Sequence, residues 1–225
     1  GVTGTQIRGN YIGIGANGNS IAGSTQTVGI EILDGGHSSN IVGGTIANYG
    51  NVISANKSYG IWYYRLASSN SIKGNIIGLQ ADGITMSGIV QDIGIFLMGA
   101  SDTRVGGSTV AERNIISGNK SHGILGAAEF SGFAGNIIKG NYIGVKKSGI
   151  DPLGNGWKDF AESGNRRDAY EGVLLTNGSY TNVIGGSLPG ERNIISANYR
   201  AGLRLESTGS DSNMVQGNYI GIGAD

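Results

Sequence analysis

A short phrase, Gly-Asn-x-Ile-Gly, recurs along the chain at nearly even intervals. Successive copies are 65, 66 and 77 residues apart and begin at Gly9, Gly74, Gly140 and Gly217. A second phrase, Asn-x-Ile-Ser-x-Asn, lies between these copies and begins at Asn51, Asn114 and Asn193. Self-similarity at a regular spacing is the signature of a repeat architecture, in which each unit packs on its neighbours. The chain must therefore fold by stacking similar units.

Each unit contains short apolar segments with alternating polarity and turn-type residues at both ends, which is typical of strands. One series of segments follows Gly29, Gly60, Gly94, Gly123, Gly172 and Gly202. Another follows Asn40, Asn70, Thr103, Asn136, Asn182 and Asn213. With the Gly-Asn-x-Ile-Gly phrase, they predict three strands per turn and, in most turns, about 31 to 33 residues.

Such a chain winds into coils that stack as parallel strands about 4.8 Å apart. Parallel sheets need both faces covered, and a solenoid achieves this by filling its interior with Ile and Val. We therefore predict an all-β, right-handed parallel β-helix of about seven coils, with residues 1–225 forming a single domain. The 43 glycines do not indicate a disordered linker, because they recur at fixed positions between Ile and Val.

One asparagine of each phrase falls at the same position of successive coils. Stacked Asn amides can bond to one another from coil to coil while also holding a turn. We predict a structural ladder of Asn10, Asn51, Asn75, Asn114, Asn141, Asn193 and Asn218. The Glu-Arg-Asn triplets that end at Asn114 and Asn193 recur with the repeat, as a turn does.

The stretch "NVIGG…ERNIISANYRAGLRL…NMVQGNYIGIGAD" resembles the Asn/Gly-rich β-helix repeats of bacterial secreted and surface proteins, within the pectate-lyase-like superfamily. The resemblance covers essentially the whole chain. It implies an extracellular or cell-surface location and a polysaccharide as partner. It does not single out one activity, because the superfamily includes lyases, hydrolases, epimerases, adhesins and inert stalks.

Composition argues against several other classes of function. The chain has 16 basic and 16 acidic residues and no Lys/Arg run, so we expect no nucleic-acid partner. It has no apolar run of about 18 residues, so we expect no membrane insertion. The absence of cysteine excludes disulfides, Cys-ligated zinc and thiol catalysis. We expect neither a cofactor nor a metal.

The resemblance also implies the motifs that an enzyme would carry. Polygalacturonase-like members have an adjacent Asp pair, a Gly-His-Gly and an Arg-x-Lys element, and none of these strings occurs here. One strand register nevertheless places His122 and Glu171 on neighbouring coils. A His–carboxylate pair can act as a general base and its orienting group, although a structural contact explains it equally well. We expect no catalytic residues, with this pair as the alternative.

Residues 145–171 form the one long departure from the repeat. This loop is about 12 residues longer than its counterparts and holds 10 of the chain's 32 charges. Long loops on a rigid solenoid are frequent binding sites, and aromatic and charged groups suit sugars and their carboxylates. The candidate ligand-binding residues are Trp157, Lys158, Asp159, Arg166 and Arg167. The alternative is a solvated insertion that packs on the rod.

Alternation along the glycine-led strands predicts a second candidate surface. If Ile61 and Ile95 point inward, then Trp62, Tyr64 and Phe96 point outward. Together with the outward residues Met98, Leu125 and Leu174 they predict an exposed apolar stripe, which is unusual for a monomer. Such a stripe fits sugar stacking, a neighbouring rod or the underside of the 145–171 loop.

The chain stops within the phrase with which it opens, so both ends resemble open repeat edges. We therefore expect uncapped ends and a segment of a longer array, or a module that associates end to end or laterally. The leading prediction is a non-catalytic extracellular β-helix segment, serving as a structural or adhesive surface module that contacts glycan. The alternative is a polysaccharide lyase or glycoside hydrolase acting near the 145–171 loop.

Overall fold

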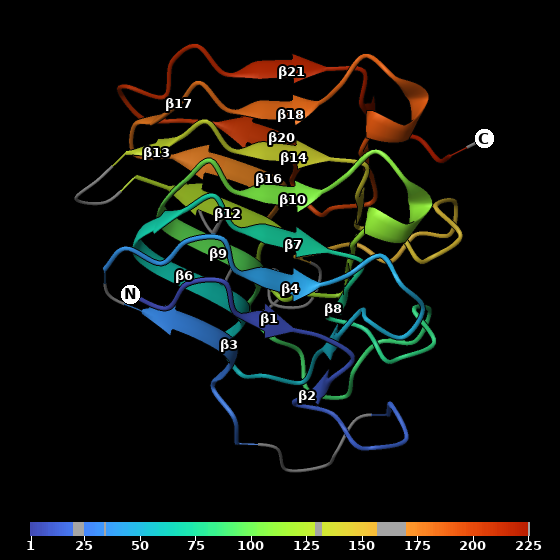
Figure 1. Cartoon of the computed structure of the whole chain (residues 1–225). Helices are drawn as coiled ribbons and strands as arrows, with labels where there is room; N and C mark the ends of the chain where they lie inside the picture. Colours follow the sequence, from blue (N-terminus) through green and yellow to red (C-terminus); the bar gives the residue numbers. More distant parts are fainter. Residues whose placement is uncertain (20–24, 34, 129–131, 157–169, 225) are drawn as a thin grey trace.

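The computed structural model describes residues 1–225 except 20–24, 34, 129–131, 157–169 and 225. Within the described residues, regular structure consists of strands and two single-turn 3₁₀ helices, η1 (Val110–Glu112) and η2 (Pro189–Glu191). The chain winds upward from the N-terminus as a stack of coils (Figure 1). Every paired strand in this stack runs parallel to its partner in the next coil.

Three sheets run along the stack. Sheet A contains β3 (Val28–Leu33), β6 (Tyr59–Ser68), β9 (Ile93–Ser101), β12 (Ile124–Ala127), β16 (Glu171–Thr176) and β20 (Ala201–Leu205). Sheet B contains β1 (Gln6–Ile7), β4 (Ile41–Gly43), β7 (Ser71–Lys73), β10 (Arg104–Gly106), β14 (Ile137–Lys139), β18 (Val183–Gly185) and β21 (Met214–Gln216). Sheet C contains β2 (Tyr11–Ile12), β5 (Val52–Ile53), β8 (Ile76–Ile77), β11 (Ile115–Ile116), β15 (Tyr142–Ile143), β19 (Ile194–Ile195) and β22 (Tyr219–Ile220).

A further small sheet pairs β13 (Phe133–Ala134) with β17 (Ser179–Tyr180). Each of the first six coils takes one strand from sheets B, C and A in turn, and the seventh contains β21 and β22. We number the coils 1 to 7 after β1, β4, β7, β10, β14, β18 and β21.

The register of sheet A follows the repeat. The vertical neighbours are Ile30, Ile61, Ile95, Ile124, Val173 and Leu203. The prediction of an all-β parallel β-helix with three strands per coil is confirmed. Because the register is set by the repeated phrases, residues that are 24 to 55 positions apart in sequence become neighbours in space.

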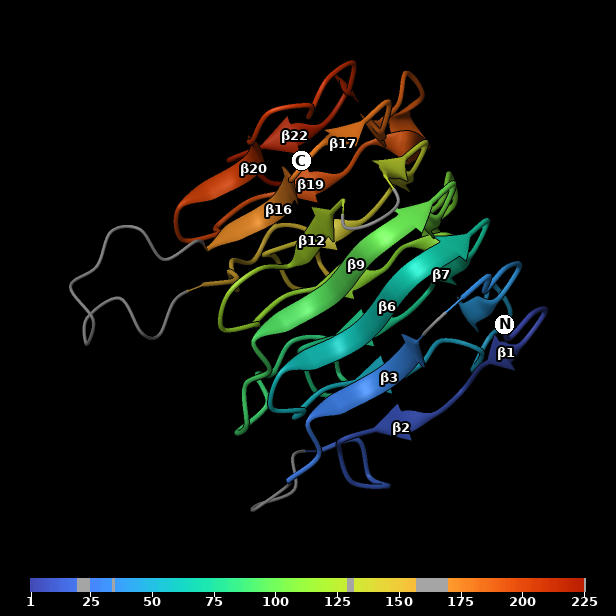
Figure 2. The ribbon, with the colours of Figure 1, turned by 90° about the vertical axis from the view of Figure 1, so that its left-hand side faces the viewer.

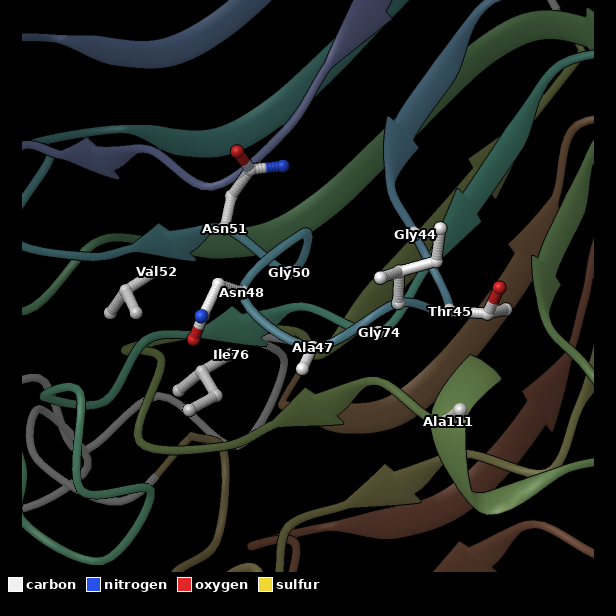
Figure 3. Close-up of a pocket in the computed structure, with 11 residues that line it drawn as sticks. Gly44, Thr45, Ala47, Asn48, Gly50, Asn51, Val52, Gly74, Ile76 and Ala111 are labelled. Atoms are coloured by element: carbon white, nitrogen blue, oxygen red, sulfur yellow. The ribbon is translucent and has the colours of Figure 1, made fainter.

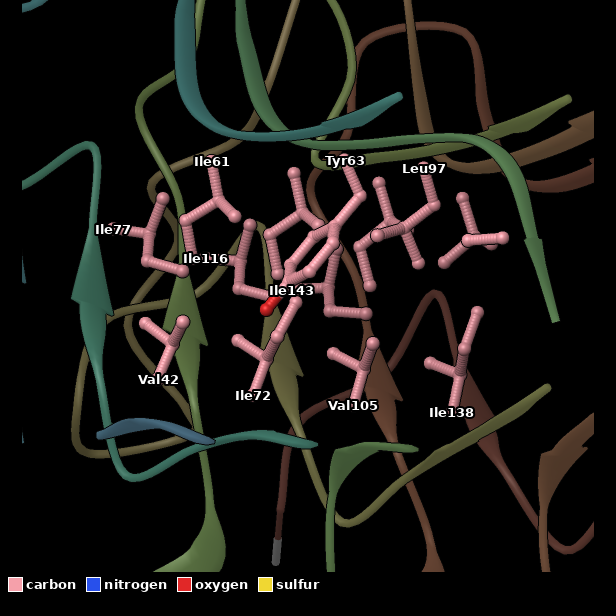
Figure 4. Close-up of a cluster of buried hydrophobic side chains, with 14 of the residues drawn as sticks. Val42, Ile61, Tyr63, Ile72, Ile77, Leu97, Val105, Ile116, Ile138 and Ile143 are labelled. Atoms are coloured by element: carbon pink, nitrogen blue, oxygen red, sulfur yellow. The ribbon is translucent and has the colours of Figure 1, made fainter. Parts of the chain in front are cut away.

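The interior is filled by branched aliphatic side chains from all three sheets (Figure 4). Ile61 from sheet A, Ile72 from sheet B and Ile77 from sheet C have no exposed surface. Each fully buried Ile or Val contributes roughly 1.5–3 kcal/mol through its burial. The same three positions recur in every inner coil, so the interior is one continuous apolar column.

Tyr63 brings a polar group into this column. Its ring lies among the aliphatic side chains with no exposed surface (Figure 4), and burial raises the pKa of its phenol. The hydroxyl has no hydrogen-bond partner among the described residues. A buried polar group without a partner costs roughly 1–3 kcal/mol, so this hydroxyl opposes folding.

Replacing Tyr63 with Phe removes the hydroxyl and keeps the ring. We expect Tyr63→Phe to raise the free energy of unfolding by about 1 kcal/mol, measured by denaturant titration. Tyr11→Phe is the control, because Tyr11 is 48% exposed, and should change stability by less than about 0.5 kcal/mol. A clear loss of stability in Tyr63→Phe would contradict this account of the hydroxyl.

The predicted asparagine ladder is confirmed over its whole length. Each Nδ2 donates to the Oδ1 of the next member at 2.9–3.0 Å, along Asn10, Asn51, Asn75, Asn114, Asn141, Asn193 and Asn218. Each Oδ1 also accepts the backbone N–H of the member before it, as Asn114 does from Asn75 at 3.0 Å. The ladder thus satisfies buried backbone and side-chain groups together.

Two more ladders run at the other corners of the coils. One contains Asn40, Asn70, Asn136, Asn182 and Asn213, with Thr103 in place of an asparagine. The other joins Asn56, Gln91, Asn119, Asn155 and Asn198 through side-chain amides at 2.7–3.1 Å. The last was not predicted, although the final Asn of the phrase Asn-x-Ile-Ser-x-Asn supplies three of its members.

The turn from sheet B to sheet C alternates in length from coil to coil. It is long at residues 44–51, 107–114 and 186–193, and it is short in the coils between them. A short turn that lies between two long turns begins with a glycine, as at Gly140. A Cβ on Gly140 would lie only 2.0 Å from the carbonyl oxygen of Gly107 in the long turn of the coil before it. Gly140 also has a φ of +70°, which disfavours other residues. The alternation therefore requires the glycine of the Gly-Asn phrase.

Removing an inner ladder member should be far more costly than removing the outermost one. Asn114→Ala removes the acceptor of the Asn75 backbone N–H and a donor to the Ile72 carbonyl in the interior, whereas the Asn75 Nδ2 keeps the Val42 and Lys73 carbonyls. We expect a loss of about 3–5 kcal/mol in the free energy of unfolding. Asn10→Ala is the matched control, because Asn10 is exposed, and should cost less than about 1 kcal/mol. Equal effects in a denaturant titration would argue against a cooperative ladder.

Candidate functional site

The outer face of sheet A carries aromatic side chains from two coils. Figure 2 shows its strands lying side by side, with β6 and β9 the longest. On β6, Ile61 and Tyr63 point inward, so Trp62 and Tyr64 lie on the outside, and the Tyr59 ring packs against Trp62. In the next coil, Phe96 of β9 is paired with Trp62 in register. We call Tyr59, Trp62, Tyr64 and Phe96 the aromatic platform.

The four rings of the aromatic platform contact one another. Trp62 and Phe96 are parallel, with centroids 6.3 Å apart and an interplanar angle of 4°. Tyr59 lies 5.2 Å from Trp62 and 5.4 Å from Phe96, and Tyr64 lies 5.4 Å from Trp62. These spacings are typical of stabilising aromatic pairs. The platform is therefore held in place by its own members.

The predicted apolar stripe is less exposed than expected. Phe96 is 6% exposed and Leu174 is 4% exposed, whereas Trp62, Tyr64, Met98 and Leu125 are half-buried. Phe96 is covered because Trp62 and Leu125 flank it in the coils on either side. With coils only about 4.8 Å apart, large outward side chains bury each other. The accessible part of the stripe is centred on Trp62 and Tyr64.

A β-bulge lies next to the aromatic platform. Between the pairs Tyr64–Met98 and Ala67–Ala100, two residues of β6 oppose one of β9. The two bulge residues, Arg65 and Leu66, have φ angles of 59° and 48°. Non-glycine residues pay an energetic cost in this conformation, and bulges often re-aim side chains beside functional sites.

The bulge positions the Arg65 side chain beside the aromatic platform. Arg65 lies over the Tyr64 ring, with its guanidinium carbon 4.7 Å from the centroid. The Trp62 Nε1 is buried and has no hydrogen-bond partner among the described residues. A stacking surface edged by a guanidinium combines groups that recognise hydroxylated and acidic rings.

The predicted neighbours His122 and Glu171 do meet on the outer face of sheet A. His122 Nδ1 lies 3.1 Å from Glu171 Oε2, and both side chains are buried. Glu171 Oε1 accepts from Arg200 at 3.3 Å and from Arg204 at 3.2 Å. The side chains of His122, Glu171, Arg200 and Arg204 form what we call the charged cluster.

Glu171 is held in its ionised form. Burial alone raises the pKa of a carboxyl, but the neighbouring His122 and the Arg204 guanidinium outweigh it and lower the Glu171 pKa. The Glu171 backbone N–H donates to His122 Nδ1 at 3.4 Å. A carboxyl with a lowered pKa and two arginine partners is a poor general acid.

Several other predicted site residues lie outside the described residues: Trp157, Lys158, Asp159, Arg166 and Arg167. The predicted insertion at residues 145–171 is described only at its two ends. There, Asn155 joins an asparagine ladder, and Tyr170 is buried with its ring edge-on to Tyr199 at 6.1 Å. Among the described residues, no three His, Cys, Asp or Glu side chains are grouped to hold a metal ion.

Sequence reasoning missed some members of both groups. Tyr59 shares a register position with His122 and Glu171, so the same alignment could have placed it at the platform. Arg204 follows Leu174 in the outward column of sheet A, but the sequence pattern did not connect it with Glu171. The position of Arg65 depends on the bulge, for which the sequence gives no signal.

Comparison with known proteins gives no further guide to the site: no protein-family model, curated protein or solved structure matches the chain. The parallel β-helix therefore stands on the structure itself. A search of the described residues finds no helix with the length and apolar character needed to cross a membrane.

The charged cluster makes a pH-dependent contribution to stability. Because folding lowers the Glu171 pKa below its ordinary value of 4.5, this contribution is complete above pH 4.5 and disappears as the pH falls through the lowered pKa. At pH 7 we expect Glu171→Gln to lose about 2 kcal/mol in the free energy of unfolding.

Denaturant titrations of both proteins at pH 7 and at about pH 3 test this linkage. The difference between wild type and Glu171→Gln should shrink toward zero at the lower pH, while both still fold. A difference that is the same at both values would show that packing, rather than charge, is the contribution of Glu171.

Proposed function

We propose that the chain is a non-catalytic β-helix module of an extracellular or cell-surface protein, and that it contacts polysaccharide through the aromatic platform. The single observation that supports this most strongly is the cluster of four rings around Trp62, with Arg65 at its edge. Aromatic rings with a polar edge stack on the apolar faces of sugar rings and bond to their hydroxyls.

The geometry of the solenoid supports an extended ligand. The platform spans two coils on the outer face of sheet A, and the charged cluster lies on the coils above it. Arginine pairs well with carboxylates, so Arg65 at the platform favours an acidic polysaccharide over a neutral one.

The proposal also includes membership of the pectate-lyase-like superfamily. It rests on the resemblance of the repeated asparagine and glycine phrases to the repeats of that superfamily.

A structural or adhesive role is favoured over catalysis. His122 and Glu171 are in contact, as an acid–base pair requires, but Glu171 has a lowered pKa and is engaged by Arg200 and Arg204. An acid catalyst of glycoside hydrolysis needs a raised pKa. The contact is accounted for as part of the charged cluster, in which buried Glu171 joins coils 4, 5 and 6.

Trp62→Ala tests the platform directly. The ligand is the acidic glycan that binds best on an array, and its affinity is measured by calorimetry. We expect Trp62→Ala to lower this affinity about tenfold, which corresponds to the free energy of one aromatic contact. Tyr180→Ala is the matched control, because Tyr180 is 44% exposed on β17, away from sheet A. It should leave affinity unchanged.

Two results would overturn the proposal. The first is binding that is unaffected by Trp62→Ala in a protein whose unfolding transition is normal. The second is release of unsaturated or reducing products from polygalacturonate or alginate, with or without Ca²⁺, which is lost in His122→Ala and Glu171→Gln. That outcome would establish the alternative, a polysaccharide lyase or glycoside hydrolase.

A further inference from the structure

Two of the three long turns between sheets B and C share a packing motif. In coil 4 the residue before the ladder asparagine is Arg113, which lies over the Tyr142 ring of coil 5 at 4.0 Å. In coil 6 the same position is Arg192, which lies over the Tyr219 ring of coil 7 at 5.0 Å. In both pairs a guanidinium stacks on a phenol beside the neighbouring short turn, and the two pairs line a smaller cavity of about 210 Å³.

The third pair, between coils 2 and 3, lacks both side chains. In its long turn the residue before the ladder asparagine is Gly50 in place of arginine, and the tyrosine position is Ile76, which pairs with Val52 below it. Figure 3 shows the cavity that results at this place. Its volume is about 310 Å³, and Gly50, Ile76 and Val52 are among its lining residues.

The lining of this cavity is mostly apolar and carries no charged side chain. Ala47, Val52 and Ile76 supply aliphatic surface, and Thr45 and Asn48 supply polar groups. Glu112, which follows the lining residue Ala111, is paired with Lys73 at 3.5 Å. The cavity therefore favours a neutral ligand with a large apolar surface.

The equivalent position in coils 4 and 5 shows which backbone carbonyl accepts a hydrogen bond there. In coils 4 and 5 the Arg113 Nε donates to the carbonyl oxygen of Gly140, the first residue of the short turn, at 3.2 Å. The residue at that position beside the cavity is Gly74, which is part of its lining. A donor on the ligand can therefore bond to the Gly74 carbonyl.

We propose that this cavity is a binding site for a neutral phenol-type ring, which replaces the tyrosine present in the other two turn pairs. The ring would lie on Val52 and Ile76, and its hydroxyl would donate to the Gly74 carbonyl. A volume of about 310 Å³ lies at the lower end of the roughly 300–1,000 Å³ of ligand sites, which suits a single ring. The phenol could come from a free aromatic compound or from a tyrosine side chain of another protein.

The test uses p-cresol as the probe and nuclear magnetic resonance titration of the labelled protein as the readout. We expect a dissociation constant on the order of 1 mM, as suits so small a ligand, with shift changes confined to residues 44–52, 74 and 76. N-acetyltyrosinamide, titrated in parallel, distinguishes the sources. If it binds as well, the site accepts a protein tyrosine, and if only p-cresol binds, the site takes free phenols.

Ile76→Tyr is the decisive variant, because Tyr11, Tyr142 and Tyr219 already occupy the same column of sheet C. It should fold normally and weaken p-cresol binding more than tenfold by filling the cavity. Ile76→Val keeps the cavity open and should retain binding. Equal binding by Ile76→Tyr and wild type, or wild-type shift changes that lie elsewhere, such as on the aromatic platform, would overturn the proposal. Absence of binding at about 20 mM p-cresol would overturn it too.

Discussion

The hydrogen bonds of the stacked asparagines are the interaction on which the rest of this structure depends. Each coil bends at its corners, and there the backbone groups leave the sheets and need other partners. An asparagine at a corner bonds to the next coil through both its amide and its carbonyl, as Asn75 does to Asn51 and Asn114. This is possible only when the coils keep one register. The ladders therefore fix the register, and the register aligns every other column of side chains.

Alignment in columns has opposite consequences inside and outside the stack. Inside, it places Ile and Val above one another and closes the interior. Outside, it brings large side chains within one coil spacing, which builds the aromatic platform and the charged cluster from residues far apart in sequence. The same regularity exposes departures from it: where Gly50 and Ile76 replace the arginine and tyrosine of the other turn pairs, a cavity opens.

The repeat predicted the fold, the register of sheet A, one complete ladder and the contact of His122 with Glu171, because these depend only on which residues share a column. It did not predict what depends on side-chain size or local strain. Phe96 is buried by neighbours whose bulk the alternation pattern does not measure. The bulge at Arg65 and Leu66 has no local signal, since neither residue favours a positive φ. The ladder through Gln91 was missed because glutamine breaks the asparagine pattern.

The most direct test of the account is disulfide cross-linking in this cysteine-free chain. Ser71, Arg104 and Ile137 are successive neighbours in one column of sheet B. Adjacent positions lie about 4.8 Å apart, within disulfide range, whereas positions two coils apart lie at about twice that distance. We predict that Ser71→Cys with Arg104→Cys, and Arg104→Cys with Ile137→Cys, form intramolecular disulfides and that Ser71→Cys with Ile137→Cys does not. Efficient cross-linking of that last pair, or failure of both adjacent pairs, would contradict the stacked-coil register.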